Sequence, residues 1–159
     1  MTAIPQPQLR VEPGDRHAED VQALLVAAEA LSQSLYPPQS IHMLDAGELD
    51  REDVLFLVAC EPHGPALGCG AIVLQGQQAA ELKRMFVAAT ARRRGVAARI
   101  LTELEALARE HGVTVLRLET GVSQPEAIAL YERFGFRRRG PFGNYEEDPL
   151  SIFMEKTLY

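Results

Sequence analysis

ELKRMFVAATARRRGVAARILTELEALARE, residues Glu81 to Glu110, sets the arrangement that we expect for the rest of the chain. It begins with an apolar strand, continues through a loop of three arginines and a glycine, and ends in an amphipathic helix that we predict over 92–110. The first N–H groups of a helix have no intrahelical partners and carry partial positive charge. The stretch therefore predicts an anion site at the helix N-terminus, suited to a diphosphate.

On the N-terminal side, apolar runs at 54–60 and 67–74 are separated by EPHGP, whose prolines and glycine are typical of a turn between antiparallel strands. The strand over 80–87 then completes a three-stranded meander. Further upstream we predict a short strand at 8–12, a core-facing helix at 17–36 and a short second helix within 40–53.

On the C-terminal side, the sequence alternates again between strand and helix patterns. We predict strands at 113–119, 136–139 and 151–158, with a helix at 124–134 between the first two. The resulting order is βαα-βββ-αβ-αβ-β, an α/β (α+β) fold. Without a repeat or a linker, residues 1–159 are expected to form a single domain whose residues 1–7 are loose.

Composition excludes several classes of protein. The chain has 47% hydrophobic and 24% charged residues, close to the average of globular domains, so a packed core is expected. A net charge of -6 argues against sequence-independent nucleic-acid binding. Two cysteines without metal-ligand spacing favour a reducing, cytoplasmic protein that has no metal site. Prolines near the N-terminus argue against a signal peptide, and no apolar run reaches the length of a membrane span.

Several motifs resemble those of the GNAT superfamily of acetyl-CoA-dependent N-acetyltransferases. RRRGVA at 92–97 fits the family's (Gln/Arg)-x-x-Gly-x-(Gly/Ala) loop, and QPEAIALY at 124–131, followed by GF at 135–136, resembles its later helix. LETG at 118–121, with DPLS at 148–151 and MEK at 154–156, resembles a bacterial branch of small members. The resemblance implies a mostly antiparallel sheet of six to seven strands, splayed at its centre, with about four helices.

The resemblance also implies how acetyl-CoA is held. The loop would meet the diphosphate with backbone N–H groups and arginine side chains, through Arg92, Arg93, Arg94, Gly95, Val96, Ala97 and Ala98. Gly95 and Ala97 lack the bulk that would keep the phosphates away. The pantetheine arm would lie along the strand residues Met85, Phe86 and Val87 and contact Gln124 and Ala127. Gln124 stands where many members have asparagine. As an alternative, the arginines only begin a solvated helix, although basic residues there oppose its dipole.

For catalysis, the resemblance implies Tyr131 as the general acid that protonates the leaving thiolate. Glu81 is the leading candidate for the general base, directly or through water, and Glu119 is the competing carboxylate. Structural alternatives are a core tyrosine and solvated strand-end carboxylates. Strand alternation puts Lys83 and Arg84 on opposite faces, so one of them, with Arg84 our candidate, could pair with a substrate carboxylate. Asn144 and Tyr145 lie in a loop that could line the acceptor site.

The expected reaction is direct transfer of an acetyl group to a primary amine of a small molecule or amino acid. Two alternatives stay open: acetylation of a protein or peptide, and a non-catalytic acyl-CoA-binding module. An apolar strand near the C-terminus could form the edge of a homodimer.

Overall fold

The structure is a computed structural model that describes residues 8–159, so our expectation for residues 1–7 lies outside the described range. Its centre is a seven-stranded sheet in the order β1-β2-β3-β4-β5-β7-β6. The strands are β1 (Arg10–Pro13), β2 (Val54–Cys60), β3 (Ala66–Leu74), β4 (Ala79–Val87), β5 (Val115–Gly121), β6 (Arg137–Arg139) and β7 (Ser151–Thr157). All neighbours are antiparallel except β4 and β5, which run parallel. The mostly antiparallel sheet is thus confirmed.

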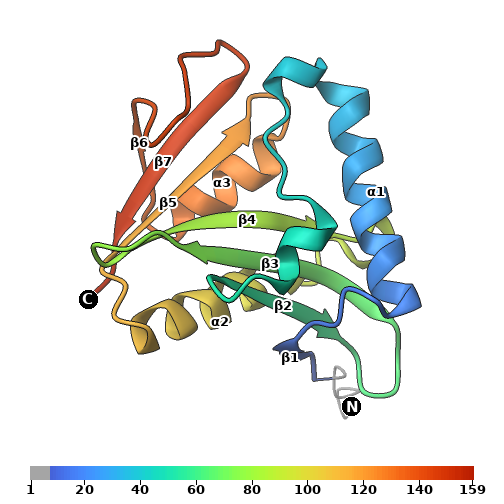
Figure 1. Ribbon diagram of the computed structural model, residues 1–159. Coiled ribbons are helices and arrows are strands. Elements are labelled where there is room, and N and C mark those ends of the chain that lie inside the picture. Colours follow the sequence, from blue (N-terminus) through green and yellow to red (C-terminus); the bar gives the residue numbers. More distant parts are fainter. Residues whose placement is uncertain (1–7) are drawn as a thin grey trace, which may run out of the picture.

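Three α-helices cover the sheet: α1 (Glu19–Leu35), α2 (Val96–Glu110) and α3 (Pro125–Arg133). Figure 1 shows α1 and α2 on opposite sides of the sheet. Val21, Leu24 and Leu25 of α1 pack on one face against inward side chains of β2 and β3. Ile100, Leu101 and Leu104 of α2 are fully buried against the other face, together with residues of α3. Each such side chain contributes about 1.5–3 kcal/mol by leaving water, so the apolar stripes of the helices fix these layers.

Two helix predictions need correction. The helix expected from residue 92 begins only at Val96, because Arg93 and Gly95 have φ angles of 65° and 74°, which no α-helix allows. The short second helix expected within 40–53 is a 3₁₀ helix, Ala46–Asp50, and not an α-helix. Another 3₁₀ helix, Pro38–Ser40, precedes it. The segment has too few apolar residues at helical spacing to bury one face, so the number of α-helices in residues 8–159 is three rather than four.

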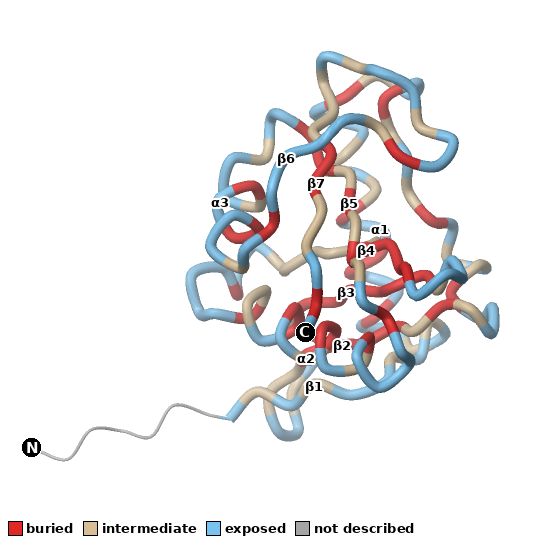
Figure 2. Tube along the Cα trace, turned by 90° about the vertical axis from the view of Figure 1, so that its left-hand side faces the viewer, coloured by how far each residue is buried: buried red, intermediate tan, exposed pale blue. Residues whose placement is uncertain are grey.

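The edges of the sheet bear on the suggested homodimer. β7, the apolar strand proposed as a dimer edge, lies between β5 and β6 and pairs with both, so the prediction of an edge there is wrong. β6 is the edge instead, and its residues Arg137, Arg138 and Arg139 are all exposed (Figure 2). Charged residues on an edge strand disfavour pairing with a second copy.

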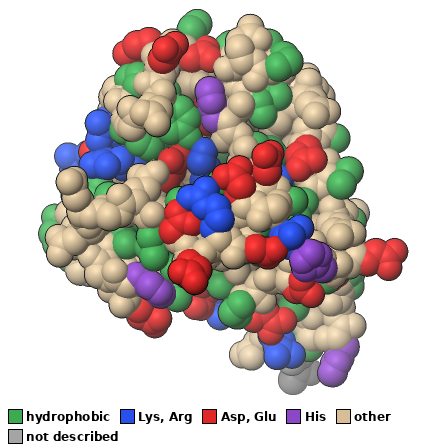
Figure 3. All heavy atoms as spheres, viewed as in Figure 1, with side chains coloured by type: hydrophobic (Ala, Val, Ile, Leu, Met, Phe, Trp, Pro, Cys, Tyr) green, Lys and Arg blue, Asp and Glu red, His purple; other side chains and the backbone are tan. Residues whose placement is uncertain are grey.

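On the face seen in Figure 3, acidic and basic side chains are interleaved rather than gathered by sign. Among the helices of residues 8–159, none is both long and apolar enough to cross a lipid bilayer.

Candidate active site

The site is built where β4 and β5 part. Their parallel pairing runs from Ala79 opposite Val115 to Leu82 opposite Leu118 and stops there. Immediately afterwards β4 has a β-bulge, since Cys69 and Ala71 of β3 face Phe86 and Lys83. Arg84, within the bulge, has a φ of 60°, a left-handed conformation that is rare for a non-glycine residue. The bulge turns β4 away from β5, as the expected splay requires.

Buried polar contacts hold the bulge open. The side chain of Arg84 is only 1% exposed, and its guanidinium donates to the carboxylate of Glu29 on α1 at 2.8 Å. It also donates to the backbone oxygens of Leu44 at 2.8 Å and Leu25 at 3.4 Å. The bulge is thereby tied to α1 and to the segment that follows α1.

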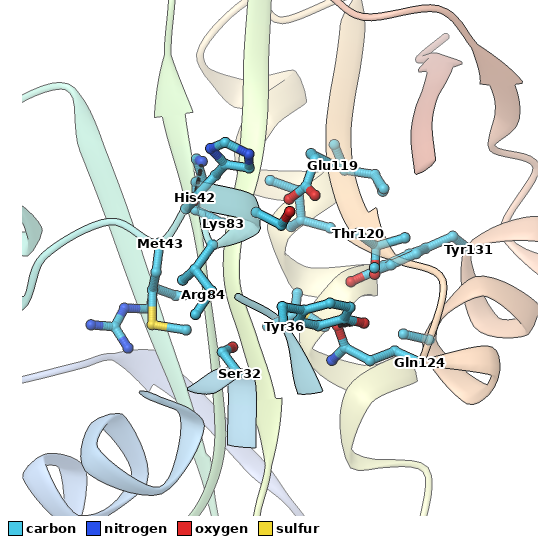
Figure 4. Close-up of a pocket in the computed structure, with 17 residues that line it drawn as sticks. Ser32, Tyr36, His42, Met43, Lys83, Arg84, Glu119, Thr120, Gln124 and Tyr131 are labelled. Carbon is cyan, nitrogen blue, oxygen red and sulfur yellow. Dashed lines mark hydrogen bonds between the residues drawn. The ribbon is translucent and has the colours of Figure 1, made fainter. Parts of the chain in front are cut away.

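A cavity of about 130 Å³ lies in the gap between the two strands (Figure 4). Its walls come from α1 and the segment after it, from the diverging ends of β4 and β5, and from the start of α3. The residues that carry polar side chains into this wall are Ser32, Tyr36, Ser40, His42, Lys83, Arg84, Glu119, Thr120, Gln124 and Tyr131.

Tyr131 projects from α3 into this cavity. Its residue surface is 6% exposed, and its ring packs edge-on against Phe136 with ring centroids 5.8 Å apart. Its hydroxyl has no hydrogen-bond partner among residues 8–159 and points toward the cavity (Figure 4). Burial, and to a lesser extent the negative charge of Glu119, raise the pKa of Tyr131, so the phenol holds its proton throughout the neutral range.

Glu119 lies at the end of β5, on the wall of the same cavity. Its Oε2 accepts a hydrogen bond of 2.8 Å from the hydroxyl of Ser151 on β7. Burial raises the pKa of this carboxyl, while the Ser151 hydrogen bond and the nearby His42 and Lys83 oppose the rise. A carboxylate in this position is a stronger base than one in water.

Glu81, our leading candidate for the base, does not line the cavity. Its two oxygens are taken by neighbours: Gln75 donates to Oε1 at 3.0 Å, and Tyr145 donates to Oε2 at 2.5 Å. The ammonium of Lys83 lies 3.2 Å from Oε2. The structure therefore brings Glu119, rather than Glu81, together with Tyr131.

Lys83 and Arg84 do not lie on opposite faces of the sheet, contrary to our prediction. Both side chains bond to the segment after α1, Lys83 to the oxygen of His42 and Arg84 to that of Leu44. The bulge adds a residue to β4 and so interrupts the alternation on which the prediction relied.

Tyr145 belongs to the β6–β7 loop and closes one side of the site without lining the cavity itself. It is packed by His42, Phe142 and Phe153 with ring centroids 5.0–5.4 Å apart. Burial and its hydrogen bond to Glu81 raise the pKa of its phenol. Asn144, next to it, is exposed and outside the cavity wall.

The segment after α1 contributes cavity residues that we did not single out from the sequence. They include Tyr36, Ser40 and His42. Ser40 donates to Asp148 of the β6–β7 loop at 2.6 Å, and the two segments approach each other at the top of Figure 1. The hydroxyl of Tyr36 donates to the side chain of Gln124 at 3.2 Å and accepts from the N–H of Ser123. The sequence does indicate a turn here, through the prolines and the serine after α1. It does not indicate the hydrogen-bond partners of Tyr36 and Ser40, which lie about a hundred residues away along the chain.

The arginine loop fits a diphosphate in its local geometry. Gly95 is exposed and has positive φ, and a Cβ added to it would meet no atom within 4 Å, so the backbone is open to a ligand. The first intrahelical hydrogen bond of α2 is from Arg99 to Gly95, which leaves the N–H groups of Val96, Ala97 and Ala98 free of helical acceptors. Arg92 and Arg93 are exposed and form no ion pair within residues 8–159, whereas Arg94 is paired with Glu61.

The other residues expected at the donor lie on both sides of the gap. Met85, Gln124 and Ala127 line the cavity, and the β5-facing edge of β4 pairs with no strand beyond Leu82. Phe86 packs toward α1 and Val87 pairs with Gly68 of β3. The open edge of β4 is therefore free to bond an extended ligand through its backbone.

Other reactive groups do not gather into a second site. Cys69 is buried, and burial raises the pKa of its thiol to about 12, so it is not a thiolate at neutral pH. Residues 8–159 contain no group of three or more His, Cys, Asp or Glu side chains placed to share a metal ion.

A bulged β4 diverging from a parallel β5, with an open helix N-terminus after it, is the arrangement expected of an acyl-CoA-dependent acetyltransferase. The family model of the Acetyltransferase (GNAT) family matches residues 23–136, and the chain belongs to this family. An IAA acetyltransferase from Azospirillum brasilense is 50% identical over 125 residues, covering 78% of this chain and 81% of that protein.

Two further relatives agree with this assignment. The uncharacterized N-acetyltransferase YsnE of Bacillus subtilis is 40% identical over 124 residues, which cover 77% of this chain and 82% of YsnE. A crystal structure from Klebsiella pneumoniae, assigned to the acyl-CoA N-acyltransferases, superposes with a TM-score of 0.80 at 36% identity. It covers 95% of this chain and 98% of the other. The resemblance seen in the motifs is thus confirmed, and acetyl-CoA is the acyl donor that the family uses.

Proposed function

We propose that this protein transfers the acetyl group of acetyl-CoA directly to a primary amine of a small molecule, with Tyr131 as general acid and Glu119 as general base. The observation that carries the proposal is that both side chains line one cavity at the point where β4 and β5 part. The name of the Azospirillum relative, which gives IAA as its substrate, supports the same view.

The donor would be held by backbone groups on both sides of the gap. The N–H groups of Val96, Ala97 and Ala98, with the side chains of Arg92 and Arg93, would bind the diphosphate. The open edge of β4 at Met85 and Val87, with Gln124 across the gap, would bond the pantetheine amides. Acetyl-CoA supplies the acetyl group as a reactive thioester.

Glu119 prepares the acceptor by taking a proton from its ammonium group, directly or through one water. Its raised pKa suits this task, because a base works best when its pKa is near the working pH. The amine nitrogen then bonds to the carbonyl carbon as the carbon–sulfur bond breaks. Tyr131 donates its phenolic proton to the departing sulfur, the acetylated nitrogen gives up its second proton, and that proton returns to Tyr131 through solvent. Glu81 has a structural part in this scheme, as the acceptor that Tyr145 and Gln75 share.

Donor binding is tested by calorimetry with Gly95→Glu, which puts a negative side chain at the proposed diphosphate site. We expect acetyl-CoA affinity to fall by about tenfold or more, from charge repulsion and lost access. Gly76→Glu is the matched control, since Gly76 is an exposed turn glycine with nearly the same φ, 73° against 74°. Unchanged affinity in Gly95→Glu would refute the donor site.

The acid is tested with Tyr131→Phe, which keeps the ring against Phe136 and removes a hydroxyl that has no partner within residues 8–159. We expect kcat to fall by about 10²–10⁴-fold with acetyl-CoA affinity unchanged. Thiol release is followed with a panel of amines. An unchanged kcat would remove Tyr131 from the mechanism. If none of the amines or peptides tested causes thiol release although acetyl-CoA binds tightly, the protein would instead be a non-catalytic acyl-CoA-binding module.

A further inference from the structure

Two cations border the acceptor end of the cavity, and the first, Lys83, is paired with a carboxylate of the protein. Its Nζ donates to the oxygen of His42 at 2.8 Å and to the hydroxyl of Tyr145 at 2.6 Å. The carboxylate of Glu81 lies 3.2 Å from the same nitrogen. The positive charge of Lys83 is thus balanced by a carboxylate of the protein. A substrate carboxylate would have to compete with Glu81 for this ammonium group.

The second cation, Arg84, is out of reach. Its side chain is almost completely buried, and its charge is paired with Glu29. Its remaining hydrogen bonds go to the backbone oxygens of Leu44 and Leu25. A substrate carboxylate in the cavity could displace neither set of contacts without opening the bulge. The pairing of Arg84 with a substrate carboxylate, which we considered from the sequence, has no support in this arrangement.

The remaining charge of the cavity is negative. Glu119 lines the wall and forms no ion pair with any residue in the range 8–159, and only Ser151 donates to its carboxylate. The unpartnered hydroxyl of Tyr131 opens onto the same space and carries no charge at neutral pH. Beyond these groups and the two cations, the wall holds two titratable side chains, His42 and Tyr36. The cavity thus attracts an ammonium group and offers no free permanent cation to a carboxylate.

We infer that the acceptor is a primary amine without a carboxylate on the adjoining carbon, so that simple amines and amino-acid amides are acetylated and free amino acids are not. This inference rests on the proposed function. An α-amino acid that presents its nitrogen to Glu119 brings its own carboxylate within a few ångströms of the same group. Like charges at such distances repel strongly where water is scarce. The inference narrows our expectation from the sequence, which allowed amino acids as acceptors.

The test compares acceptors that differ only at the adjoining carbon. Alanine, alaninamide and ethylamine form a small series, and leucine, leucinamide and isopentylamine a larger one. Thiol release from acetyl-CoA is measured with the wild-type protein at pH 8. Values of kcat/KM are expressed per concentration of neutral amine, which removes the effect of differing amine pKa values. The amide separates the effect of charge from that of size.

We expect the amide and the amine to exceed the amino acid by about tenfold or more in at least one series. If the amino acid is acetylated as well as its amide, the inference is overturned while the proposed function stands. If no acceptor in either series releases thiol although acetyl-CoA binds, the proposed function fails and the inference fails with it.

A second measurement tests the cause. Binding of alaninamide and alanine to the coenzyme A complex is measured by calorimetry in wild type and in Glu119→Gln. We expect the preference for the amide to shrink in the variant, because the repelling charge is gone. A preference of undiminished size in Glu119→Gln would overturn the charge argument.

Discussion

Replacing Arg84 with methionine should destabilise the protein by about 3–5 kcal/mol, because it removes a buried guanidinium and leaves its partners behind. The backbone oxygens of Leu44 and Leu25 lose their donor, at about 1–3 kcal/mol each, with the longer 3.4 Å bond to Leu25 at the low end. Glu29 is 44% exposed and regains water, so its ion pair adds at most about 1 kcal/mol. Methionine retains the apolar stem, so packing losses are small.

Urea unfolding of wild type and Arg84→Met gives this difference directly, and the melting temperature should fall by about 6 °C or more. Arg99→Met is the matched control. Arg99 is 47% exposed, and its one ion pair within residues 8–159 is with Glu103 one helical turn away, so its loss should cost under about 0.5 kcal/mol. Acetyl-CoA affinity should also fall in Arg84→Met, because the bulge that opens the cleft loses its anchor. A stability loss no larger than that of Arg99→Met would refute the reasoning.

Two further changes test the frame of the site. Glu119→Gln should be more stable than wild type at pH 7: burial raises the folded-state pKa of Glu119, so the wild type loses stability as pH rises through the carboxyl range, and the variant does not. Urea unfolding should show that the difference in unfolding free energy between variant and wild type vanishes below about pH 4, the unfolded-state pKa. An equal difference at pH 7 and below pH 4 would contradict this sign. Gly121→Ala should cost about 1–3 kcal/mol, because a Cβ there overlaps the phenol of Tyr36, which holds Gln124 at the start of α3. Gly47→Ala is the control, because its Cβ meets nothing within 4 Å. Equal melting temperatures for the two variants would show that the Tyr36 side chain moves aside without loss of stability.

The sequence was sufficient for the layers of the fold because they depend on local periodicity. The stripe Val96, Ile100 and Leu104 repeats at the helical period and is buried as expected. The apolar runs around EPHGP pair as β2 and β3. The helix boundary at Arg92 was missed because the arginines do not reveal positive φ angles, and only Gly95 signals one.

The candidate site was harder to predict because its contacts join distant residues. Tyr131 could be found from its motif. The choice between Glu81 and Glu119 depends on Tyr145, sixty-four residues from Glu81, because Tyr145 donates to Glu81 and not to Glu119. No periodicity in the sequence indicates such a contact. The contribution of His42 was equally hidden, because it depends on a turn-rich segment folding back on β4.

Arg84 shows why a costly backbone conformation persists at this position. Glycine would adopt a φ of 60° without strain, and an arginine there costs about 1 kcal/mol or more. A glycine at this position, however, would have no side chain to connect the bulge to α1 or to the segment after it. The guanidinium instead joins the bulge to Glu29 of α1 and to Leu44, two residues beyond the cavity residue His42. The gap proposed for the donor and the wall proposed for the acceptor are therefore held by one side chain, and a change at Arg84 should disturb both together.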